Sequence, residues 1–258
     1  VLFKYKKEYK KINYKIPNFF KYSLINSKKK NAKFKIISAL SVFYDLQNPN
    51  IFLSDIKKIL HKDGIFYLEF QDLLKILQMN MFDTICHEHL EYYSVTFINN
   101  LLKKHNLRIF EHYYNDINGG SSAYLICHDK SRFQTNLKKI NNILSKENKF
   151  GVGKISTYIN FKKRIDKLKK QLNLKIDKIL KEGKSIHGYA ASTKGNVILQ
   201  YCNISPKFLD CIVEVNSFKY NRYTPGSKIK IVSEKQIKKK KPDYLLVLPW
   251  HFKEHIIK

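Results

Sequence analysis

The sequence contains little arginine, although it is strongly basic. Its formal net charge is +28, from 49 basic residues against 21 acidic ones. The only arginines are Arg108, Arg132, Arg164 and Arg222. Base readout and bidentate phosphate contacts favour the guanidinium group, and the lysines are spread over every segment. The sequence therefore predicts no nucleic-acid partner, and a lysine-rich RNA-associated protein is the less favoured interpretation.

Long apolar runs and paired cysteines are also missing. No apolar run reaches the roughly 18 residues of a membrane-spanning helix, and the start of the chain lacks a signal-peptide pattern. We therefore expect a soluble cytoplasmic protein with no membrane partner. The four cysteines are Cys86, Cys127, Cys202 and Cys211. Because no C-x-x-C pair occurs, neither a zinc ribbon nor a disulfide framework is indicated.

The first half of the chain has the pattern of an α/β fold. Apolar runs predict strands over 35–43 and 65–70, the second after a turn at 62–64. Between them, apolar residues at helical spacing predict a helix with Asn50 as its N-cap. Further helices are expected near 73–78 and 94–105. The turn at 118–120 then joins two strands, 107–113 and 123–127, as an antiparallel pair.

The second half repeats the α/β pattern after a long helical stretch. Residues 134–182 hold only two glycines, and the spacing of apolar residues from Ile155 onward predicts a long amphipathic helix. The remaining elements are predicted as strands over 185–190, 208–215 and 244–248, with helices over 193–201 and 234–239. This alternation resembles half of a doubly wound sheet.

One segment has an unusual density of titratable groups. It is Phe82-Asp83-Thr84-Ile85-Cys86-His87-Glu88-His89-Leu90-Glu91-Tyr92-Tyr93, and Asn118-Gly119-Gly120-Ser121 follows after a helix and a strand. Two histidines that bracket a glutamate indicate chemistry. The alternatives are a hydrogen-bonded surface loop or, less favoured, a metal site. His87 and His89 lie two residues apart, not the four that place both rings on one helix face.

These residues resemble the sugar C-methyltransferase family, in which an F-D-x-I-Y-H-E-H-L-x-Y segment lies at the active site. A second block resembles the family's C-terminal domain. It comprises Gly188-Tyr189-Ala190-Ala191-Ser192-Thr193-Lys194-Gly195-Asn196, Arg222-Tyr223-x-Pro225-Gly226, Pro242-Asp243-Tyr244 and Leu248-Pro249-Trp250-His251-Phe252-Lys253. The resemblance covers roughly residues 33 to 258.

The resemblance implies an α/β fold with two Rossmann-like parts. We expect a truncated methyltransferase catalytic domain over 1–130, a helical connector over 131–183 and a truncated, nucleotide-sugar-binding α/β domain over 184–258. Family members typically begin with a cysteine-rich zinc-binding domain and a glycine-rich turn that cradles S-adenosylmethionine. This chain shows neither pattern, so we expect a fragment in which zinc has no site.

The resemblance also implies the reaction, which is methyl transfer from S-adenosylmethionine to a carbon next to the ketone of a nucleotide-linked keto-sugar. By residue-by-residue match, His89 is the candidate base that forms the enolate. Glu88 is expected to orient an imidazole or bind a sugar hydroxyl, and His87 to polarise the ketone oxygen. The family commonly has tyrosine at the position of Cys86, so this substrate contact departs from the pattern.

Other residues are expected to bind the two substrates. Lys194, Asn196 and Arg222 are candidates for the diphosphate of the nucleotide-sugar, against the alternative of an ordinary strand-to-helix turn. Ser41 and Phe43, at the end of the first strand, are candidates for contact with the cofactor's adenosine, against plain strand-end packing. Either Tyr92 or its neighbour Tyr93 is expected to face the substrate. The competing function is a non-catalytic protein that retains only nucleotide-sugar binding.

Overall fold

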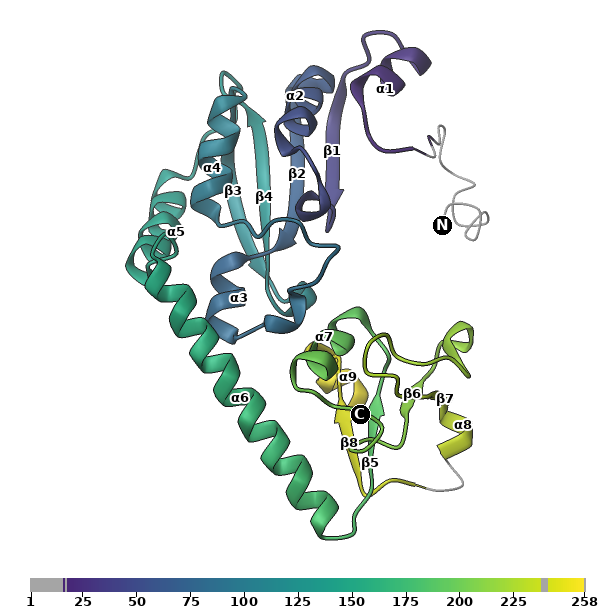
Figure 1. Cartoon of the computed structure of the whole chain (residues 1–258). Coiled ribbons are helices and arrows are strands. Elements are labelled where there is room, and N and C mark those ends of the chain that lie inside the picture. The colour runs from purple at the N-terminus through teal and green to yellow at the C-terminus, as the bar shows by residue number, and fades with distance from the viewer. Residues whose placement is uncertain (1–15, 17, 238–240, 258) are drawn as a thin grey trace. The chain divides into compact units, whose positions relative to one another are not determined.

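The computed structural model describes residue 16 and the ranges 18–237 and 241–257 (Figure 1). The chain divides into two compact units whose boundary crosses the chain several times. The first unit comprises Val1–Phe70, Thr96–Tyr113 and Ala123–Asn141, and the second comprises Gln71–Val95, Tyr114–Ser122 and Asn142–Lys258. The domain limits expected at residues 130 and 183 stay a prediction.

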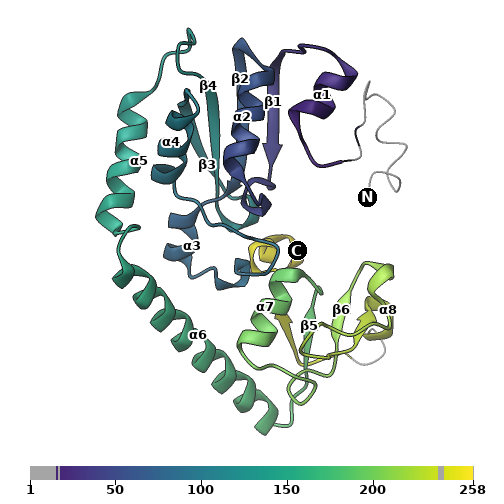
Figure 2. The same ribbon diagram turned by 45° about the horizontal axis from the view of Figure 1, so that its top comes forward.

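The first sheet has four strands in the order β1-β2-β4-β3. Its strands are β1 (Phe34–Leu40), β2 (Leu60–Gln71), β3 (Leu107–Asn115) and β4 (Ser121–His128). β1 and β2 are parallel, and a helical crossover joins them. The short connection between β3 and β4 makes them an antiparallel hairpin, as predicted. Figures 1 and 2 show α2 (Pro49–Ile59) and α4 (Val95–Lys104) over one face of this sheet.

The turn predicted at residues 62–64 is wrong, because these residues lie inside β2. Pairing with β1 advances from Phe34↔Leu60 to Ile36↔Ile65, so β2 bulges here. A Cβ built on Gly64 would lie 2.8 Å from the carbonyl oxygen of Phe34. The glycine therefore permits a close approach of two strands and does not form a chain reversal.

Two predicted boundaries next to these strands also shift. Asn48, not Asn50, caps α2, since its side-chain oxygen accepts a hydrogen bond from the backbone N–H of Ile51 at 3.0 Å. Pro49 takes the first helical position, where its missing N–H needs no partner. At the other boundary, β1 ends at Leu40 because Ser41 takes a left-handed φ of 52°.

Of the remaining helices of the described residues, α1 (Tyr22–Lys28) was not predicted, and those from α3 onward agree in type with the sequence pattern. The latter are α3 (Leu73–Met79), α5 (Leu137–Phe150), α6 (Ile155–Lys181), α7 (Thr193–Tyr201), α8 (Glu234–Ile237) and α9 (Lys253–Ile257). Single 3-10 turns are η1 (Phe43–Asp45), η2 (Phe82–Thr84), η3 (Ile117–Gly119), η4 (Ser217–Lys219) and η5 (Trp250–Phe252). Gly151, with φ 81°, separates α5 from α6. The expected long amphipathic helix after Ile155 is confirmed as the 27 residues of α6.

The second sheet is parallel throughout, in the order β7-β6-β5-β8. Its strands are β5 (Ile186–Tyr189), β6 (Ile212–Glu214), β7 (Ile231–Ser233) and β8 (Tyr244–Val247). β6 is shorter than predicted, and β7 was not predicted. The order reverses between β5 and β8, which creates a switch point at their carboxyl ends. The predicted α/β class is confirmed.

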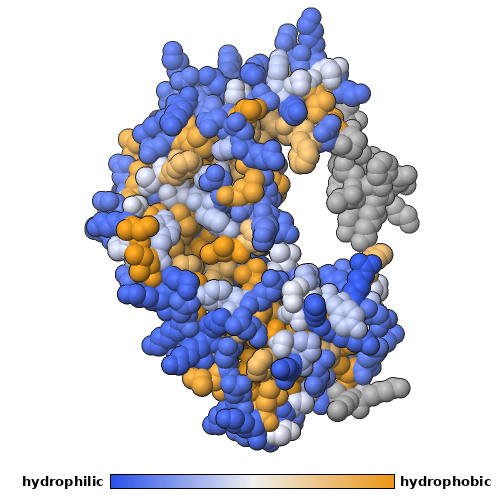
Figure 3. Space-filling view, in the orientation of Figure 1, coloured by the Kyte–Doolittle hydropathy of each residue, from blue (hydrophilic) through white to orange (hydrophobic). Residues whose placement is uncertain are grey.

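The surface is largely hydrophilic, as the dispersed lysines predict. Hydrophilic residues cover much of the face that Figure 3 shows. On α6, exposed lysines alternate with the buried Phe161, Ile165 and Ile176, so the basic side chains form a solvated face. Among the described residues, none of the helices combines the length and the hydropathy needed to span a membrane.

Candidate active site

The loop that follows α3 carries the two histidines of the sequence motif, and it belongs to the second unit. Residues 82–84 form η2, and the backbone N–H of His89 donates to the carbonyl oxygen of Cys86 at 3.2 Å, which closes a tight turn. Thr84 at the base of this loop is fully buried. His87 and Glu88 are exposed at its tip, and His89 is half-buried. The turn therefore leaves the side chains of His87 and Glu88 in solvent and partly buries that of His89.

A chain of hydrogen bonds orients the ring of His89. The side-chain amide of Gln71, at the end of β2, donates from Nε2 to the carbonyl oxygen of Asn118 at 3.0 Å. Its Oε1 therefore faces Thr84 and accepts the Thr84 hydroxyl proton. The oxygen of Thr84 also lies 3.4 Å from Nδ1 of His89. Because that hydroxyl proton is directed to Gln71, Nδ1 is the donor, and of the two neutral tautomers this contact favours the one with its lone pair on Nε2.

The carbonyl of Asn118 also accepts a hydrogen bond from Lys194. The distance from Nζ of Lys194 to this oxygen is 3.0 Å. Lys194 stands in the first turn of α7, whose N-cap Ser192 accepts from the backbone N–H of Gly195 at 3.0 Å. Burial lowers the pKa of Lys194 below its ordinary value, while the charge of Asp83 acts in the opposite direction. The second unit thus brings Lys194 to the same carbonyl that orients Gln71.

Trp250 and His251, which follow β8, join this group. Nε1 of Trp250 donates to the carboxylate of the buried Asp83 at 2.9 Å. Burial lowers the pKa of His251, and the positive charge of Lys194 lowers it further. A Cβ on Gly119, where φ is +90°, would lie 3.0 Å from the ring of Trp250. The β5–β8 switch point and the histidine loop therefore contribute side chains to one cluster within the second unit.

Cys86, His87 and Glu88 occupy the more accessible part of the loop. The thiol of Cys86 and the carboxylate of Glu88 interact electrostatically. Burial, followed by the interaction with Glu88, raises the pKa of the thiol above its ordinary value. Backbone N–H donation and the thiol lower the pKa of the Glu88 carboxyl, so Glu88 is a carboxylate at neutral pH. Cys86 is therefore a poor nucleophile, since the thiolate is the reactive form.

The two neighbouring tyrosines differ in exposure. Tyr93 is buried, whereas Tyr92 is half-buried and donates its hydroxyl to the carbonyl oxygen of Thr84 at 3.3 Å. The rings of Tyr92 and His89 lie 6.2 Å apart in an edge-to-face arrangement. Tyr92 is the tyrosine that contacts the histidine loop, and its role as a substrate contact stays a prediction.

The structure leaves Asn196 and Arg222 outside this hydrogen-bonded group. Asn196 is half-buried on α7, and the side chain of Arg222 is exposed on the segment between η4 and β7. The basic residue that the structure holds against the β5–α7 turn is Lys219, whose Nζ donates to the carbonyl oxygen of Ala191 at 2.6 Å. Lys219 also pairs with Glu214 at 3.1 Å. Sequence reasoning missed this pair, because neither residue belongs to a recognisable motif.

The residues expected to bind the cofactor lie in the first unit, at the carboxyl end of β1. The side chain of Phe43 is fully buried, stacked on Phe70 at a centroid distance of 5.7 Å. Its backbone, not its ring, is therefore the part that a ligand could reach. Ser41 is half-buried, with its N–H donating to the carbonyl oxygen of Glu69 at 2.8 Å. Their assignment to S-adenosylmethionine stays a prediction.

Gln71 and Thr84 were not singled out by the sequence, although the hydrogen bonds of the site depend on them. Gln71 lies outside the histidine motif, and Thr84 lies inside it at the position that the F-D-x-I pattern leaves unspecified. The available signal was position, since Gln71 ends a buried parallel strand, where ligand sites of α/β sheets form. Within the part of the chain that the structure describes, no three His, Cys, Asp or Glu residues are grouped to hold a metal ion.

Comparison with known proteins gives two family models and one curated relative. A model described as a methyltransferase domain matches residues 7–112, and one described as the C-methyltransferase C-terminal domain matches residues 116–258. The chain is 28% identical over 205 residues to C-methyltransferase NovU of Streptomyces niveus, which covers 80% of this chain and 49% of the relative. It therefore spans about half the length of that relative.

Two solved methyltransferases show weak similarity. Magnesium protoporphyrin IX methyltransferase from Synechocystis PCC 6803 is 12% identical, with 38% of this chain and 46% of that chain covered and a TM-score of 0.30. A possible histamine N-methyltransferase from Thermotoga maritima is 14% identical, with 39% and 57% covered and a TM-score of 0.30. The match of the C-terminal model extends over more than half of the 258 residues, and the chain belongs to the C-methyltransferase family that this model describes.

Proposed function

We propose that the protein transfers a methyl group from S-adenosylmethionine to a carbon next to the ketone of a nucleotide-linked keto-sugar. The observation that carries this proposal is the orientation of His89. Its Nδ1 lies 3.4 Å from the hydroxyl oxygen of Thr84, which favours the neutral tautomer in which Nε2 is the basic nitrogen. Membership of a C-methyltransferase family supports attack by carbon rather than by oxygen or nitrogen.

The proposed step begins with proton abstraction. Nε2 of His89 takes a proton from the carbon next to the ketone, and the C–H electron pair becomes the enolate double bond while charge develops on the ketone oxygen. S-adenosylmethionine supplies the electrophilic methyl group that this carbon attacks, and its sulfonium leaves as a neutral thioether. A positioned base contributes typically about 10²–10⁴-fold to such a step.

Other residues of the loop would stabilise the charge and hold the sugar. His87 is exposed and can donate to the developing enolate oxygen. Glu88, held as a carboxylate, can accept from a sugar hydroxyl. Cys86 and Tyr92 flank the same turn as substrate contacts.

Lys194 is the proposed contact for the diphosphate of the nucleotide. Only one of its three N–H donors is needed for the carbonyl of Asn118, so the others can meet an anionic oxygen. The N-terminal turn of α7 favours negative charge as well. Asn196 and Arg222 are proposed as further, weaker contacts. In the first unit, Ser41 and the backbone of Phe43 are proposed to meet the cofactor's adenosine.

A second candidate function is nucleotide-sugar binding without catalysis. The second sheet carries its own switch point, with Lys194 and Trp250 at it, so this unit can bind a ligand without cofactor chemistry. This candidate predicts binding of a nucleoside diphosphate that the variant Lys194→Gln weakens, without any binding of S-adenosylmethionine.

Calorimetry with S-adenosylmethionine, followed by an assay of methyl transfer, tests the proposal. Because this chain shows no glycine-rich turn for the cofactor, it is measured beside a form extended upstream to include any such turn. We expect the extended form to bind, and its turnover to fall by about 10²-fold or more in His89→Gln, while His87→Gln retains part of the activity. Inactivity of His87→Gln with full activity of His89→Gln would exchange the two roles. Absence of cofactor binding together with retained nucleotide binding would favour the second candidate.

A further inference from the structure

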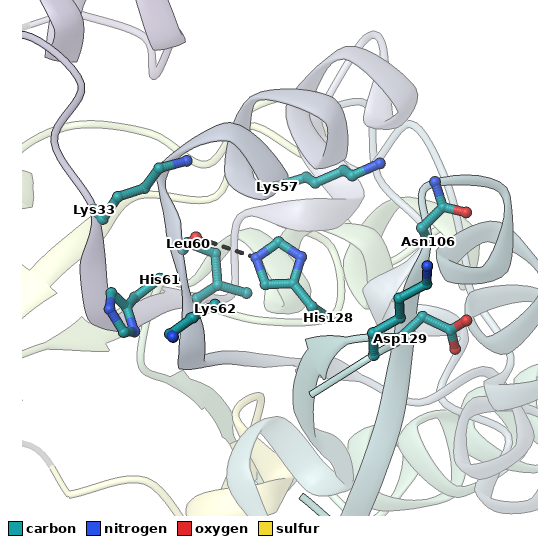
Figure 4. Close-up of a pocket in the computed structure, with 9 residues that line it drawn as sticks. Lys33, Lys57, Leu60, His61, Lys62, Asn106, His128 and Asp129 are labelled. Atoms are coloured by element: carbon teal, nitrogen blue, oxygen red, sulfur yellow. Dashed lines mark hydrogen bonds between the residues drawn. The ribbon is translucent and has the colours of Figure 1, made fainter. Parts of the chain in front are cut away.

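The first unit contains a basic pocket at the end of its sheet that the proposed reaction does not use. The pocket has a volume of about 760 Å³ and an open mouth (Figure 4). It is lined by Lys33, Lys57, Leu60, His61, Lys62, Asn106, His128, Asp129 and Lys130. Lys33 precedes β1 and Leu60 begins β2, so the pocket lies at the amino ends of the two parallel strands. The carboxyl ends, where Ser41 stands, lie at the opposite edge of the same sheet.

The charge of this pocket is strongly one-sided. Four lysines and two histidines face a single carboxylate, that of Asp129. Among the residues that the structure describes, Lys57, Lys62 and Lys130 have no carboxylate within ion-pair distance. A cleft lined by one sign of charge concentrates counter-ions more strongly than a flat surface with the same charge.

Local hydrogen bonds fix two of the lining side chains. Nζ of Lys33 donates to the carbonyl oxygen of Lys58 at the end of α2. Nε2 of His128 lies 3.1 Å from the carbonyl oxygen of Leu60 and must donate to it, because a carbonyl only accepts (Figure 4). These two bonds order the wall of the pocket beside Lys57.

The positive charge around the pocket also affects the pKa of a neighbouring histidine, His105. The pKa of His105, which precedes the lining residue Asn106, is lowered by burial first and then by the charges of Lys57 and Lys104. The local field therefore already disfavours another positive charge. An anion would relieve this repulsion.

We propose that this pocket binds a small anion with two or more linked phosphates. Lysine ammonium groups act as point charges for phosphate and accommodate several oxygens without fixed geometry. The pocket volume lies within the range of about 300–1,000 Å³ of small-molecule sites, so a phosphate chain fits with or without an attached nucleoside. Asp129 at its edge would accept from a hydroxyl or amino group of an attached organic part.

Titration of the full chain with sodium tripolyphosphate and with adenosine triphosphate tests this inference. The measurement is calorimetry at about 0.1 M ionic strength, so that distant surface charges are screened. The pocket variant is Lys62→Gln/Lys130→Gln, in which both exposed side chains lose their charge. The matched control is Lys163→Gln/Lys170→Gln, which removes two exposed lysines from α6 with the same change in net charge.

We expect the pocket variant to weaken binding of both anions at least about tenfold and the control to leave it unchanged. Equal affinities for the two anions would show recognition of the phosphate chain alone, and tighter binding of adenosine triphosphate would add a contact to the nucleoside. An equal loss in both variants overturns the inference in favour of diffuse attraction. Tighter binding of single-stranded RNA, with a steep dependence on salt, overturns it in favour of a nucleic-acid surface.

Discussion

Replacing Thr84 by valine removes one hydroxyl from a buried site without changing the shape of the side chain. The hydroxyl donates to Gln71 and accepts from Nδ1 of His89, so both hydrogen bonds vanish together. The oxygen of Gln71 then loses a buried donor, which costs about 1–3 kcal/mol of folding free energy. Nδ1 of His89 loses the acceptor that favours the Nδ1–H tautomer.

The effect on His89 can be measured without any turnover. A net hydrogen bond of about 1 kcal/mol corresponds to a factor of about five in the ratio of the two neutral tautomers. Nitrogen NMR of the imidazole rings distinguishes these tautomers, and comparison with His89→Gln identifies the signal among the nine histidines. We expect the Nδ1–H tautomer in the wild-type chain and a mixture in Thr84→Val.

Thr84→Ser is the control, because serine retains the hydroxyl and loses only a methyl group. It should keep the wild-type tautomer. If His89 carries its proton on Nε2 in the wild-type chain, or if Thr84→Val leaves the tautomer unchanged, the reasoning from Gln71 to the base is refuted.

Three other changes test the packing and charge of the two units. Burial raises the pKa of Asp72 from 3.8 to about 6. The contribution of the protonated carboxyl to folding stability is therefore fully present below about pH 3.8, and it is lost as pH rises through about 6. Asp72→Asn keeps a helix cap and removes the titrating group. In urea unfolding, its free energy of unfolding relative to that of the wild type should rise by about 3 kcal/mol from pH 4 to pH 8. Gly64→Ala should destabilise the chain by about 1–3 kcal/mol, because the new Cβ meets backbone at 2.8 Å, whereas Gly153→Ala meets nothing within 4 Å and should be nearly neutral. Trp250→Phe should cost about 1–3 kcal/mol through the unpaired carboxylate of Asp83, and a smaller loss in Trp250→Phe/Asp83→Asn would assign that cost to the hydrogen bond.

The helix over 193–201 was predictable because its signals are local. Ser192 caps it through a hydrogen bond three residues along the chain, and its bounds in the structure are those that the sequence indicated. The strand over 231–233 lacked such a signal, since three residues are too few to show alternation. The bulge at Gly64 was interpreted as a turn because its cause is the carbonyl of Phe34, a contact that only pairing with β1 reveals.

The candidate site shows the same limit. The histidine loop stood out because its titratable residues are consecutive, so His89 could be chosen directly. Gln71 could not be chosen, because its partners Thr84 and Asn118 lie far along the chain. Arg222 was chosen because it lies in a motif of the family, but the basic residue that contacts the β5–α7 turn in the structure is Lys219.

The turn at residues 118–120 links Gln71 and Lys194, because both side chains donate to the carbonyl oxygen of Asn118. The backbone conformation of the turn sets the direction of this carbonyl. Asn118 has φ 58°, Gly119 has φ 90° and Gly120 has φ 142°, conformations that a side chain larger than glycine resists at the last two positions. This path turns the carbonyl of Asn118 so that its two lone pairs meet Gln71 and Lys194. The same oxygen thereby fixes the amide that directs the proton of Thr84 and anchors the proposed diphosphate contact. A change in the turn should therefore alter the tautomer of His89 and the position of Lys194 together, because both depend on the carbonyl of Asn118.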